Sequence, residues 1–371
     1  MRGMSVAATP RFLFVPVSGP GGAGEYHRAL AVARGAERRW PGCEIRFVLN
    51  TAAPYAASAP YPGLRLDDSP TRSNAAVCAY VRSVRPDVVV FDSAGRQAQY
   101  AAAREVGAAV VYVSSRPKTR WKGFRWRRMR LLDQHWIAQP RILGGAPGPY
   151  EQLKLRVLGR PELVFLDTVH EPVDAAAVRD LQARLQLEPG RYVVLCPGGG
   201  GDFGTGPDPA AVFAQAAELL QARLDCPVVA VLGAGARAAA ADSPTHAGRT
   251  LTALPNGVLL GLIHDAAVAA VNGGSLLLQS VAQGTPLVAA PIAGDQAARI
   301  RRCADFGCVR ELRLEPRALA EGVAALLDDA PARAAMRAGA GRMGLHNGVE
   351  TAMEAIERLL CRREAHTEVL A

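Results

Sequence analysis

The sequence predicts an α/β protein of two domains, each built on a parallel sheet covered by helices. In each half of the chain, short apolar runs of strand length alternate about six times or more with stretches of helical periodicity. No internal repeat or low-complexity tract interrupts this alternation. The length of 371 residues exceeds what one hydrophobic core usually serves. We therefore expect two Rossmann-like domains facing across a cleft, the first over residues 1–166 and the second over residues 167–346.

Composition narrows the classes of protein to consider. Hydrophobic residues make up 49% and charged residues 21% of the chain, as in soluble globular proteins. No apolar run approaches the roughly 20 residues that span a bilayer, and no signal-peptide core precedes the first strand. The seven cysteines are scattered without a CxxC pair, and the seven histidines show no metal-ligand spacing. We expect a cytoplasmic protein with reduced thiols and no metal.

The formal net charge of +9 indicates a partner with negative charge, such as nucleic acid, anionic lipid or a phosphate-bearing substrate. Residues 116–130 hold eight basic residues and no acidic one, interleaved with Trp121, Phe124, Trp126 and Met129. Basic and aromatic side chains together suit a membrane interface with anionic lipid. A solvated basic face whose aromatics pack inward is the plain alternative. Single-stranded nucleic acid or a phosphorylated acceptor would also suit such a segment.

The first half begins with a buried strand, Arg11–Val17, followed by a glycine-rich loop and a helix. Such a loop also occurs in dinucleotide sites, but the next strand, Glu44–Leu49, lacks the closing carboxylate that would bind a ribose. A proline-rich loop over Pro54–Ser73 is long enough to overhang a ligand site. The remaining elements are a helix over Asn74–Arg85, strands over 88–92, Ala109–Ser114 and Trp136–Ala138, a loop over 141–152, and an interdomain linker over Leu163–Val173.

The second half opens with a helix over Asp174–Gln186 and a strand over Tyr192–Cys196. Four consecutive glycines, Gly198–Gly201, follow the strand, and such backbone suits a segment that another group approaches closely. A surface loop without a ligand is the alternative. The following elements are a helix over Pro209–Arg223, a strand over Val228–Leu232, a strand and loop over Thr250–Leu262, and helices over Pro316–Leu327 and Val349–Arg362.

Residues 268–308 form the most informative stretch, because they contain two strand–turn–helix units in succession. The first turn contains Gly273 and Gly274, and a helix begins at Ser275, a good N-cap residue. After the second strand, Asp295 and Gln296 stand at the start of another helix. The carboxyl ends of parallel strands are where open α/β sheets bind ligands, and a glycine-flanked helix N-terminus is suited to an anion.

This order of strand, Gly-Gly turn, helix, GxPL strand and Asp-Gln resembles the donor-binding half of GT-B glycosyltransferases. It is most similar to the lipid-linked N-acetylglucosaminyltransferase of peptidoglycan synthesis and the UDP-sugar hydrolase of pseudaminic acid synthesis. The resemblance implies that the helix at Ser275 takes the donor diphosphate and that Gln279 meets the ribose, where the family has Glu. It also implies that Asp295 and Gln296 hold the sugar. The implied donor site comprises Gly199, Gly200, Leu254, Asn272, Gly273, Gly274, Ser275, Gln279, Asp295 and Gln296.

The resemblance extends to the glycine-rich loop of the first half, where Glu25 stands in place of the family's loop histidine. A carboxylate at a loop–helix junction can take a proton from a sugar hydroxyl, although a helix N-terminus stabilises its charge and weakens it as a base. Glu25 as a simple complement to the helix dipole is the alternative. Asp92, at the end of its strand, and His27 are further candidates for the base. The acceptor or another anionic partner is expected to meet Gly24, Arg28, Arg120, Arg125 and Arg128.

The sequence and this resemblance therefore predict a metal-independent glycosyltransferase that moves a hexosyl or N-acetylhexosaminyl group from a nucleotide sugar, of the UDP type, to a hydroxyl acceptor. The resemblance alone implies that the enzyme is inverting. The acceptor is expected to be lipid-linked or otherwise anionic, the nucleotide sugar is a co-substrate, and no cofactor is implied. The rivals are a UDP-sugar hydrolase or epimerase, a non-catalytic donor-binding or membrane-docking subunit, and, less favoured, a nucleic-acid binder. By the same resemblance, a helix within 347–371 crosses back onto the first domain. Peripheral contact with the inner face of the cytoplasmic membrane is expected through residues 116–130.

Overall fold

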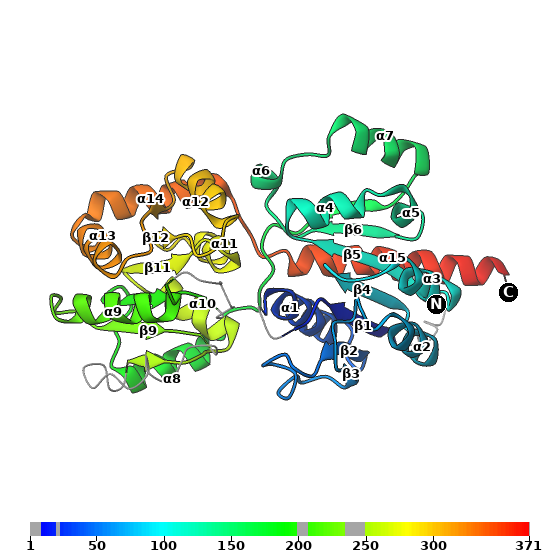
Figure 1. Ribbon diagram of the computed structural model, residues 1–371, viewed down its shortest axis with the longest axis horizontal. Coiled ribbons are helices and arrows are strands. Elements are labelled where there is room, and N and C mark those ends of the chain that lie inside the picture. Colours follow the sequence, from blue (N-terminus) through cyan, green and yellow to red (C-terminus); the bar gives the residue numbers. More distant parts are fainter. Residues whose placement is uncertain (1–8, 20–22, 199–206, 234–248, 371) are drawn as a thin grey trace, which may run out of the picture. The chain divides into compact units, whose positions relative to one another are not determined.

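The computed structural model describes residues 9–19, 23–198, 207–233 and 249–370 (Figure 1). The chain divides into two compact units, of which unit 1 comprises Met1–Val169 and Gly348–Ala371 and unit 2 comprises His170–Asn347. Each unit contains one parallel β-sheet packed against helices, so the predicted α/β class with two Rossmann-like domains is confirmed.

Unit 1 contains seven strands: β1 (Arg11–Pro16), β2 (Glu44–Asn50), β3 (Gly63–Leu66), β4 (Val88–Asp92), β5 (Ala109–Ser114), β6 (Gln134–Ile137) and β7 (Glu162–Phe165). Their order in the sheet is β3-β2-β1-β4-β5-β6-β7, and every neighbouring pair is parallel. Successive residues of β1 face opposite cores, with Phe12 and Phe14 on one face and Leu13 and Val15 on the other. The order reverses between β1 and β4, which makes the ends of these two strands the switch point of the sheet.

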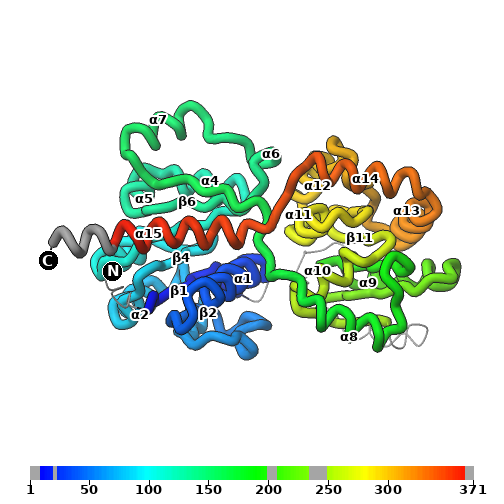
Figure 2. Tube along the Cα trace, turned by 180° about the vertical axis from the view of Figure 1, so that it is seen from behind, coloured from blue at the N-terminus to red at the C-terminus, as the bar shows by residue number. Residues whose placement is uncertain are grey.

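The helices of unit 1 are α1 (Gly24–Arg39), α2 (Asn74–Val84), α3 (Gln97–Glu105), α4 (Pro117–Gly123), α5 (Trp126–Met129), α6 (Arg141–Gly144), α7 (Pro149–Leu158) and α15 (Val349–Leu370). The C-terminal helix α15 runs beside α1 and shares its apolar core (Figure 2). Gly35 permits this close packing, because a Cβ there would lie 2.6 Å from a methyl carbon of Val349. The last helix of the chain is thereby part of unit 1.

Unit 2 contains six strands: β8 (Val193–Cys196), β9 (Val228–Val231), β10 (Thr250–Leu251), β11 (Val268–Asn272), β12 (Leu287–Ala290) and β13 (Arg310–Glu311). All pairs are parallel in the order β10-β9-β8-β11-β12-β13, with the switch point between β8 and β11. Its helices are α8 (Ala175–Leu185), α9 (Pro209–Gln221), α10 (Asn256–His264), α11 (Ser275–Ala282), α12 (Gln296–Asp305), α13 (Pro316–Asp328) and α14 (Ala330–Met343).

Four sequence-based assignments are wrong in part. The loop predicted over Pro54–Ser73 contains β3, and the linker predicted over Leu163–Val173 contains most of β7. Both are edge strands with few buried residues, so their apolar signal is weak. The loop predicted over 141–152 contains α6 and the start of α7, and Thr250–Leu262 is mostly helix α10. In the described part of the chain, no helix combines the length and the apolar content needed to cross a bilayer.

Candidate functional site

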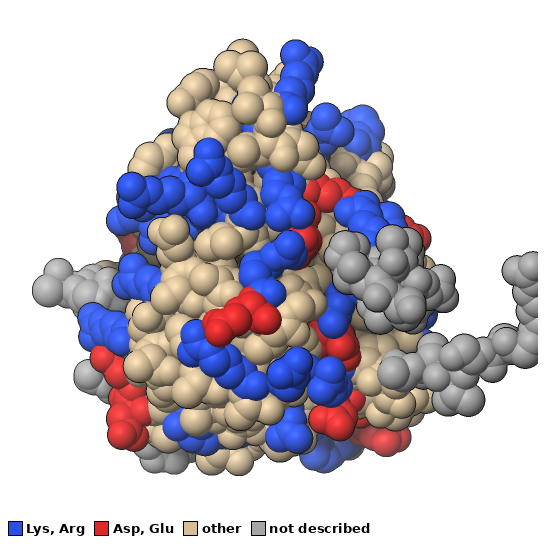
Figure 3. All heavy atoms as spheres, turned by 90° about the vertical axis from the view of Figure 1, so that its right-hand side faces the viewer, with Lys and Arg blue, Asp and Glu red and all other residues tan. Residues whose placement is uncertain are grey.

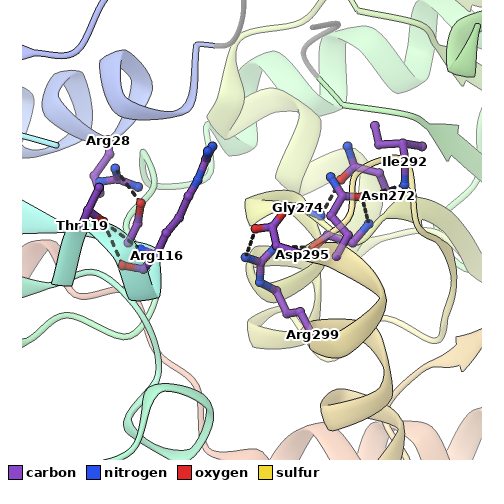
Figure 4. Close-up of polar contacts among 11 residues, drawn as sticks. Arg28, Arg116, Thr119, Asn272, Gly274, Ile292, Asp295 and Arg299 are labelled. Atoms are coloured by element: carbon purple, nitrogen blue, oxygen red, sulfur yellow. Dashed lines mark hydrogen bonds and ion pairs between the residues drawn. The ribbon is translucent and has the colours of Figure 1, made fainter. Parts of the chain in front are cut away.

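In unit 2, the loops that follow β8 and β11 are joined by the side chain of Asn272, the last residue of β11 (Figure 4). Asn272 is buried, its Nδ2 donates to the carbonyl oxygen of Pro197, and its Oδ1 accepts from the backbone N–H of Gly274 at 2.8 Å. Glycines permit this approach, since a Cβ on Gly198 would lie 2.6 Å from Nδ2 and one on Gly274 would lie 2.8 Å from Oδ1. Asn272 therefore sets the shape of both loops at the switch point.

The side chain of Gln296 makes a second brace, between the loops after β11 and β12. Gln296 is the buried first residue of α12, and its Oε1 accepts from the backbone N–H groups of Gly273 at 3.1 Å and Ile292 at 3.0 Å. The resemblance assigned the amides of Gly273 and Gly274 to the donor diphosphate. In the structure, side-chain oxygens of Gln296 and Asn272 accept from these two amides. The backbone donors that face a ligand therefore begin at Ser275.

The N-terminus of α11 retains donors that no side chain caps in the described residues. Gly274 is the N-cap residue, rather than Ser275 as predicted, so the amides of Ser275 to Leu277 form the first turn. Ser275 is exposed, and this end of the helix carries the positive pole of the dipole. Arg299 adds a cation, because its guanidinium donates to the carbonyl oxygen of Gly273 and to Asp295 at 3.2 Å (Figure 4). The turn is thus suited to a phosphate or diphosphate.

Further along α11, Gln279 is 9% exposed, and its Oε1 accepts from Asn256 Nδ2 at 3.4 Å. Asn256 begins α10, two residues after the half-buried Leu254. The sequence analysis did not single out Asn256, whose one signal was its place at the start of that helix. Two amides therefore lie where the resemblance expects a carboxylate. The predicted residues Gly199 and Gly200 lie outside the described residues.

In unit 1, a buried ion pair closes the end of β4. Arg28 of α1 (Figure 4) donates two hydrogen bonds of 2.7 Å to the two carboxylate oxygens of Asp92. The side chain of Arg28 is 9% exposed and that of Asp92 is 1% exposed. Burial raises the pKa of Asp92 to about 6, although Arg28 favours its charged form. Arg28, predicted to meet an anion, and Asp92, predicted as a second base, are therefore already engaged with each other.

Glu25 differs from Asp92 in its surroundings. It lies in the first turn of α1, just after the exposed Gly24, and is partly exposed. Within the described part of the chain, no hydrogen bond or ion pair engages its carboxylate. His27 is exposed, and its ring meets that of Tyr26 edge-on with centroids 5.4 Å apart. Of the three predicted bases, Glu25 is the carboxylate with access to solvent, and it adds to the negative charge near Arg28.

The three arginines predicted to meet an anionic partner from residues 116–130 differ in their contacts. Arg120 is buried and donates to two backbone carbonyls at the end of α6. Arg128 lies over the rings of Tyr100 and Tyr112, 5.2 and 4.7 Å from their centroids. Arg125 is exposed at the surface, in contrast to the other two. Arg120 and Arg128 thus make contacts within unit 1, whereas Arg125 is available to a partner.

The sequence analysis missed an aromatic pair formed by Tyr26 of α1 and Tyr55 in the loop after β2. The rings of Tyr26 and Tyr55 stack with centroids 4.0 Å apart and an interplanar angle of 7°. The Tyr55 hydroxyl donates to Ser18 Oγ at 3.2 Å, and the same oxygen accepts from the backbone N–H of Asn50 at 3.0 Å. No sequence pattern pairs these residues. Among the described residues, no three His, Cys, Asp or Glu side chains lie together as a metal site would need.

No family model matches the sequence, and no curated protein matches it. Among solved structures, the chain is similar to the spinosyn forosaminyltransferase SpnP, at 17% identity and a TM-score of 0.63, over 95% of this chain and 99% of that chain. The chain is also similar to the glycotransferase of kitacinnamycin, at 18% identity and a TM-score of 0.60, over 95% of this chain and 99% of that chain. For LpCGTa in complex with UDP, the identity is 16% and the TM-score is 0.62, over 95% of this chain and 100% of that chain.

These neighbours define the class of the protein at the level of its fold. These structures have the GT-B fold and match almost the whole chain, so the predicted GT-B fold is confirmed. The finer resemblance, to the lipid-linked N-acetylglucosaminyltransferase and the UDP-sugar hydrolase, stays a prediction.

Proposed function

We propose that the protein is an inverting, metal-independent glycosyltransferase that uses a UDP-sugar and a hydroxyl acceptor. The observation that carries the proposal is the N-terminus of α11, where open backbone donors are fixed by Asn272 and Gln296 beside the cation of Arg299. Two structures with a similar fold, LpCGTa and a UDP-glucose: anthocyanidin 3-O-glucosyltransferase, are complexes with UDP. They support a nucleotide diphosphate at this turn.

The donor binds unit 2 through several kinds of contact. The diphosphate accepts hydrogen bonds from the amides of Ser275 to Leu277, and Arg299 balances its charge, so that no metal is required. The amide side chains of Gln279 and Asn256 meet the ribose. Asp295 is exposed and meets the sugar, and Gln296 contributes its Nε2, because its Oε1 is occupied.

The acceptor hydroxyl is activated from unit 1 by Glu25. As the acceptor oxygen attacks C1 of the sugar, its proton passes to the Glu25 carboxylate, and the bond between C1 and the phosphate oxygen breaks. The configuration at C1 inverts, because the displacement is a single step. The negative charge that develops on the departing UDP is stabilised by the dipole of α11. Asp92 serves as a structural group beside this site, since both of its oxygens accept from Arg28. Cations at the surface of unit 1, such as Arg125, suit a lipid-linked or otherwise anionic acceptor.

The proposal is tested by nucleotide binding and by turnover in one set of variants. Wild type, Gln279→Ala, Glu25→Gln and Glu37→Gln are titrated with UDP, GDP and dTDP, and UDP release is followed with a panel of UDP-sugars and membrane extract as acceptor source. We expect Glu25→Gln to lose about 10²- to 10⁴-fold in kcat with unchanged UDP affinity. Glu37 is the matched control, because it lies further along the same helix and its carboxylate accepts a hydrogen bond from the Tyr61 hydroxyl. Gln279→Ala is expected to weaken nucleotide binding.

Each rival predicts a different result. Release of UDP without any acceptor indicates a hydrolase, and binding of UDP without turnover indicates a donor-binding subunit. A protein whose unfolding midpoint no nucleotide raises contradicts the donor site itself, because a ligand that binds only the folded state must stabilise it.

A further inference from the structure

Apolar side chains are exposed in one region of unit 1. Of the seven large apolar side chains that are exposed in the described residues, five lie between residues 121 and 157. Three of them are on α7, where Tyr150, Leu153 and Val157 are 63%, 52% and 64% exposed. Their spacing of three and seven residues places them on one side of the helix. A soluble helix normally turns such a side towards its core, so this one lacks its partner.

The orientation of α7 is fixed by contacts on its other side. Lys154 is buried, and its Nζ donates to the carbonyl oxygen of Phe124 at 3.0 Å. Glu151 accepts from the backbone N–H of Gly148 at 3.0 Å and approaches Arg120 to 3.8 Å. A helix that buries its lysine and presents leucine and valine to solvent is held in place, so the exposure of its apolar side is built into the fold.

The region around α7 is strongly basic. Residues 116–160 contain twelve basic and two acidic residues, so this segment by itself exceeds the net charge of +9 carried by the whole chain. Figure 3 shows Lys and Arg side chains gathered on this face below and beside an uncharged projection at the top, where Figure 1 has α7. Trp121 is 57% exposed, and the guanidinium of Arg125 lies 4.3 Å from its ring centroid. Apolar anchors bordered by cations match a lipid interface of negative charge.

We propose that the docking surface, made of Trp121 and the Tyr150, Leu153 and Val157 side of α7, inserts into the headgroup region of an anionic bilayer. This proposal differs from the sequence-based expectation for residues 116–130. Phe124 and Met129 are buried in unit 1, so α7 provides most of the apolar contact and the 116–130 segment provides cations. This inference goes beyond glycosyl transfer and does not depend on it.

The same observations weigh against other partners. A second copy of the chain, paired through a two-fold axis, would bring together two segments that each hold twelve basic and only two acidic residues. A nucleic acid would use the cations and stack on Trp121 or Tyr150, but it has no use for the exposed aliphatic groups of Leu153 and Val157. A bilayer, in contrast, can bury these aliphatic side chains.

The test is sedimentation of the full chain with vesicles of phosphatidylcholine alone or with 30% phosphatidylglycerol. The wild type is expected to bind only the anionic vesicles, and Leu153→Ser with Val157→Ser is expected to weaken binding by about tenfold or more. Leu219→Ser is the matched control, because Leu219 is an exposed leucine of unit 2, 42% exposed. A second variant, Lys118→Gln with Arg127→Gln and Arg156→Gln, removes three exposed cations and should weaken binding about tenfold to hundredfold, with the loss reproduced by high salt.

The outcomes are decisive because all of these residues are exposed and their loss leaves the fold intact, which the unfolding midpoint checks. Equal binding of the aliphatic variant and the wild type overturns the proposal, as does equal binding to neutral and anionic vesicles. Binding of oligonucleotides that is tighter than vesicle binding and insensitive to the aliphatic variant assigns the surface to nucleic acid. UDP affinity is measured in parallel, so a failed vesicle test is distinguished from a failed donor site.

Discussion

The two sheets end in different ways at their switch points. In unit 1, the end of β4 carries Asp92, a buried carboxylate that is neutralised by Arg28. In unit 2, the end of β11 carries Asn272, a buried neutral amide that holds backbone groups in place. Both strands lie at the reversal of strand order, where α/β proteins bind their ligands. We call the first end closed, because its charges neutralise each other. We call the second end open, because no charged side chain caps the positive pole of α11 in the described residues.

Under the proposed function, this difference corresponds to two kinds of substrate, the donor and the acceptor. A constant anionic group, such as a diphosphate, is best met by backbone donors, whose positions are set by the fold and braced by Asn272 and Gln296. A variable acceptor is met by side chains, which can change without altering the sheet. Under the proposed function, Glu25 is such a side chain in unit 1, whereas the carboxylate of Asp92 is already paired with Arg28.

The largest expected effect comes from breaking the closed end. Arg28→Met leaves the Asp92 carboxylate buried without its cation, which should cost about 3–5 kcal/mol of the free energy of unfolding at pH 8. The pKa of Asp92 is about 6 with Arg28 present, and it rises further without it. A protonated Asp92 needs no cation, so the cost of the substitution falls as the pH falls from 8 to 5. Urea denaturation at several pH values measures both quantities.

A double variant, Arg28→Met with Asp92→Leu, serves as the control for this prediction. It removes both charges and should recover most of the lost stability. If the loss of unfolding free energy caused by Arg28→Met grows as the pH falls, the ion pair as described is contradicted. Protonation of Asp92 should reduce that loss, because a neutral carboxyl group needs no cation.

Substitution of Asn272, at the end of β11, is expected to reduce the free energy of unfolding less than Arg28→Met does, but to weaken nucleotide binding more. Asn272→Ala leaves the carbonyl of Pro197 and the N–H of Gly274 without partners, which should lower the free energy of unfolding by about 2–4 kcal/mol. Nucleotide binding should be lost with it, since the turn before α11 is no longer held. Asn272→Asp is the sharper variant, because it keeps an acceptor for Gly274 and adds a negative charge. Calorimetric titration with UDP that finds wild-type affinity in both variants would contradict the bracing role.

The parts of the fold that the sequence predicted are those with continuous buried runs. The central strands β1, β4, β11 and β12 are almost wholly buried, so nearly every residue in them is apolar. The edge strand β3 buries one residue of four and gives no comparable signal. Helix α7 was missed for a different reason. Its apolar side faces solvent and its lysine faces inward, the reverse of the pattern that marks a helix packed on a core.

The candidate site was predictable in its location and less so in its contacts. Glycines, a strand end and Asp-Gln located the turn at Gly273–Ser275 because each is a local signal. The sequence could not show that Gln296, 23 residues away, occupies the Gly273 amide, since that bond depends on how two loops meet. In the same way, Asp92 was identified as a carboxylate at a strand end, but its pairing with Arg28 arises from packing across 64 residues.

The smallest expected effect comes from substitution of Arg299, which tests how much of the UDP affinity depends on the positive charge beside the turn at Gly273–Ser275. Arg299 supplies a cation beside the turn, and its side chain is 15% exposed, so solvent screens it in part. Arg299→Gln keeps a donor for the carbonyl of Gly273 but removes the charge, and we expect UDP affinity to fall roughly fivefold, about 1 kcal/mol. The loss should shrink at 0.5 M salt because screening already weakens the attraction there. Arg301→Gln is the matched control, since Arg301 is exposed two residues further along α12. If both substitutions weaken binding equally, the effect belongs to the general charge of α12, and the backbone donors of α11 carry the diphosphate without a dedicated cation.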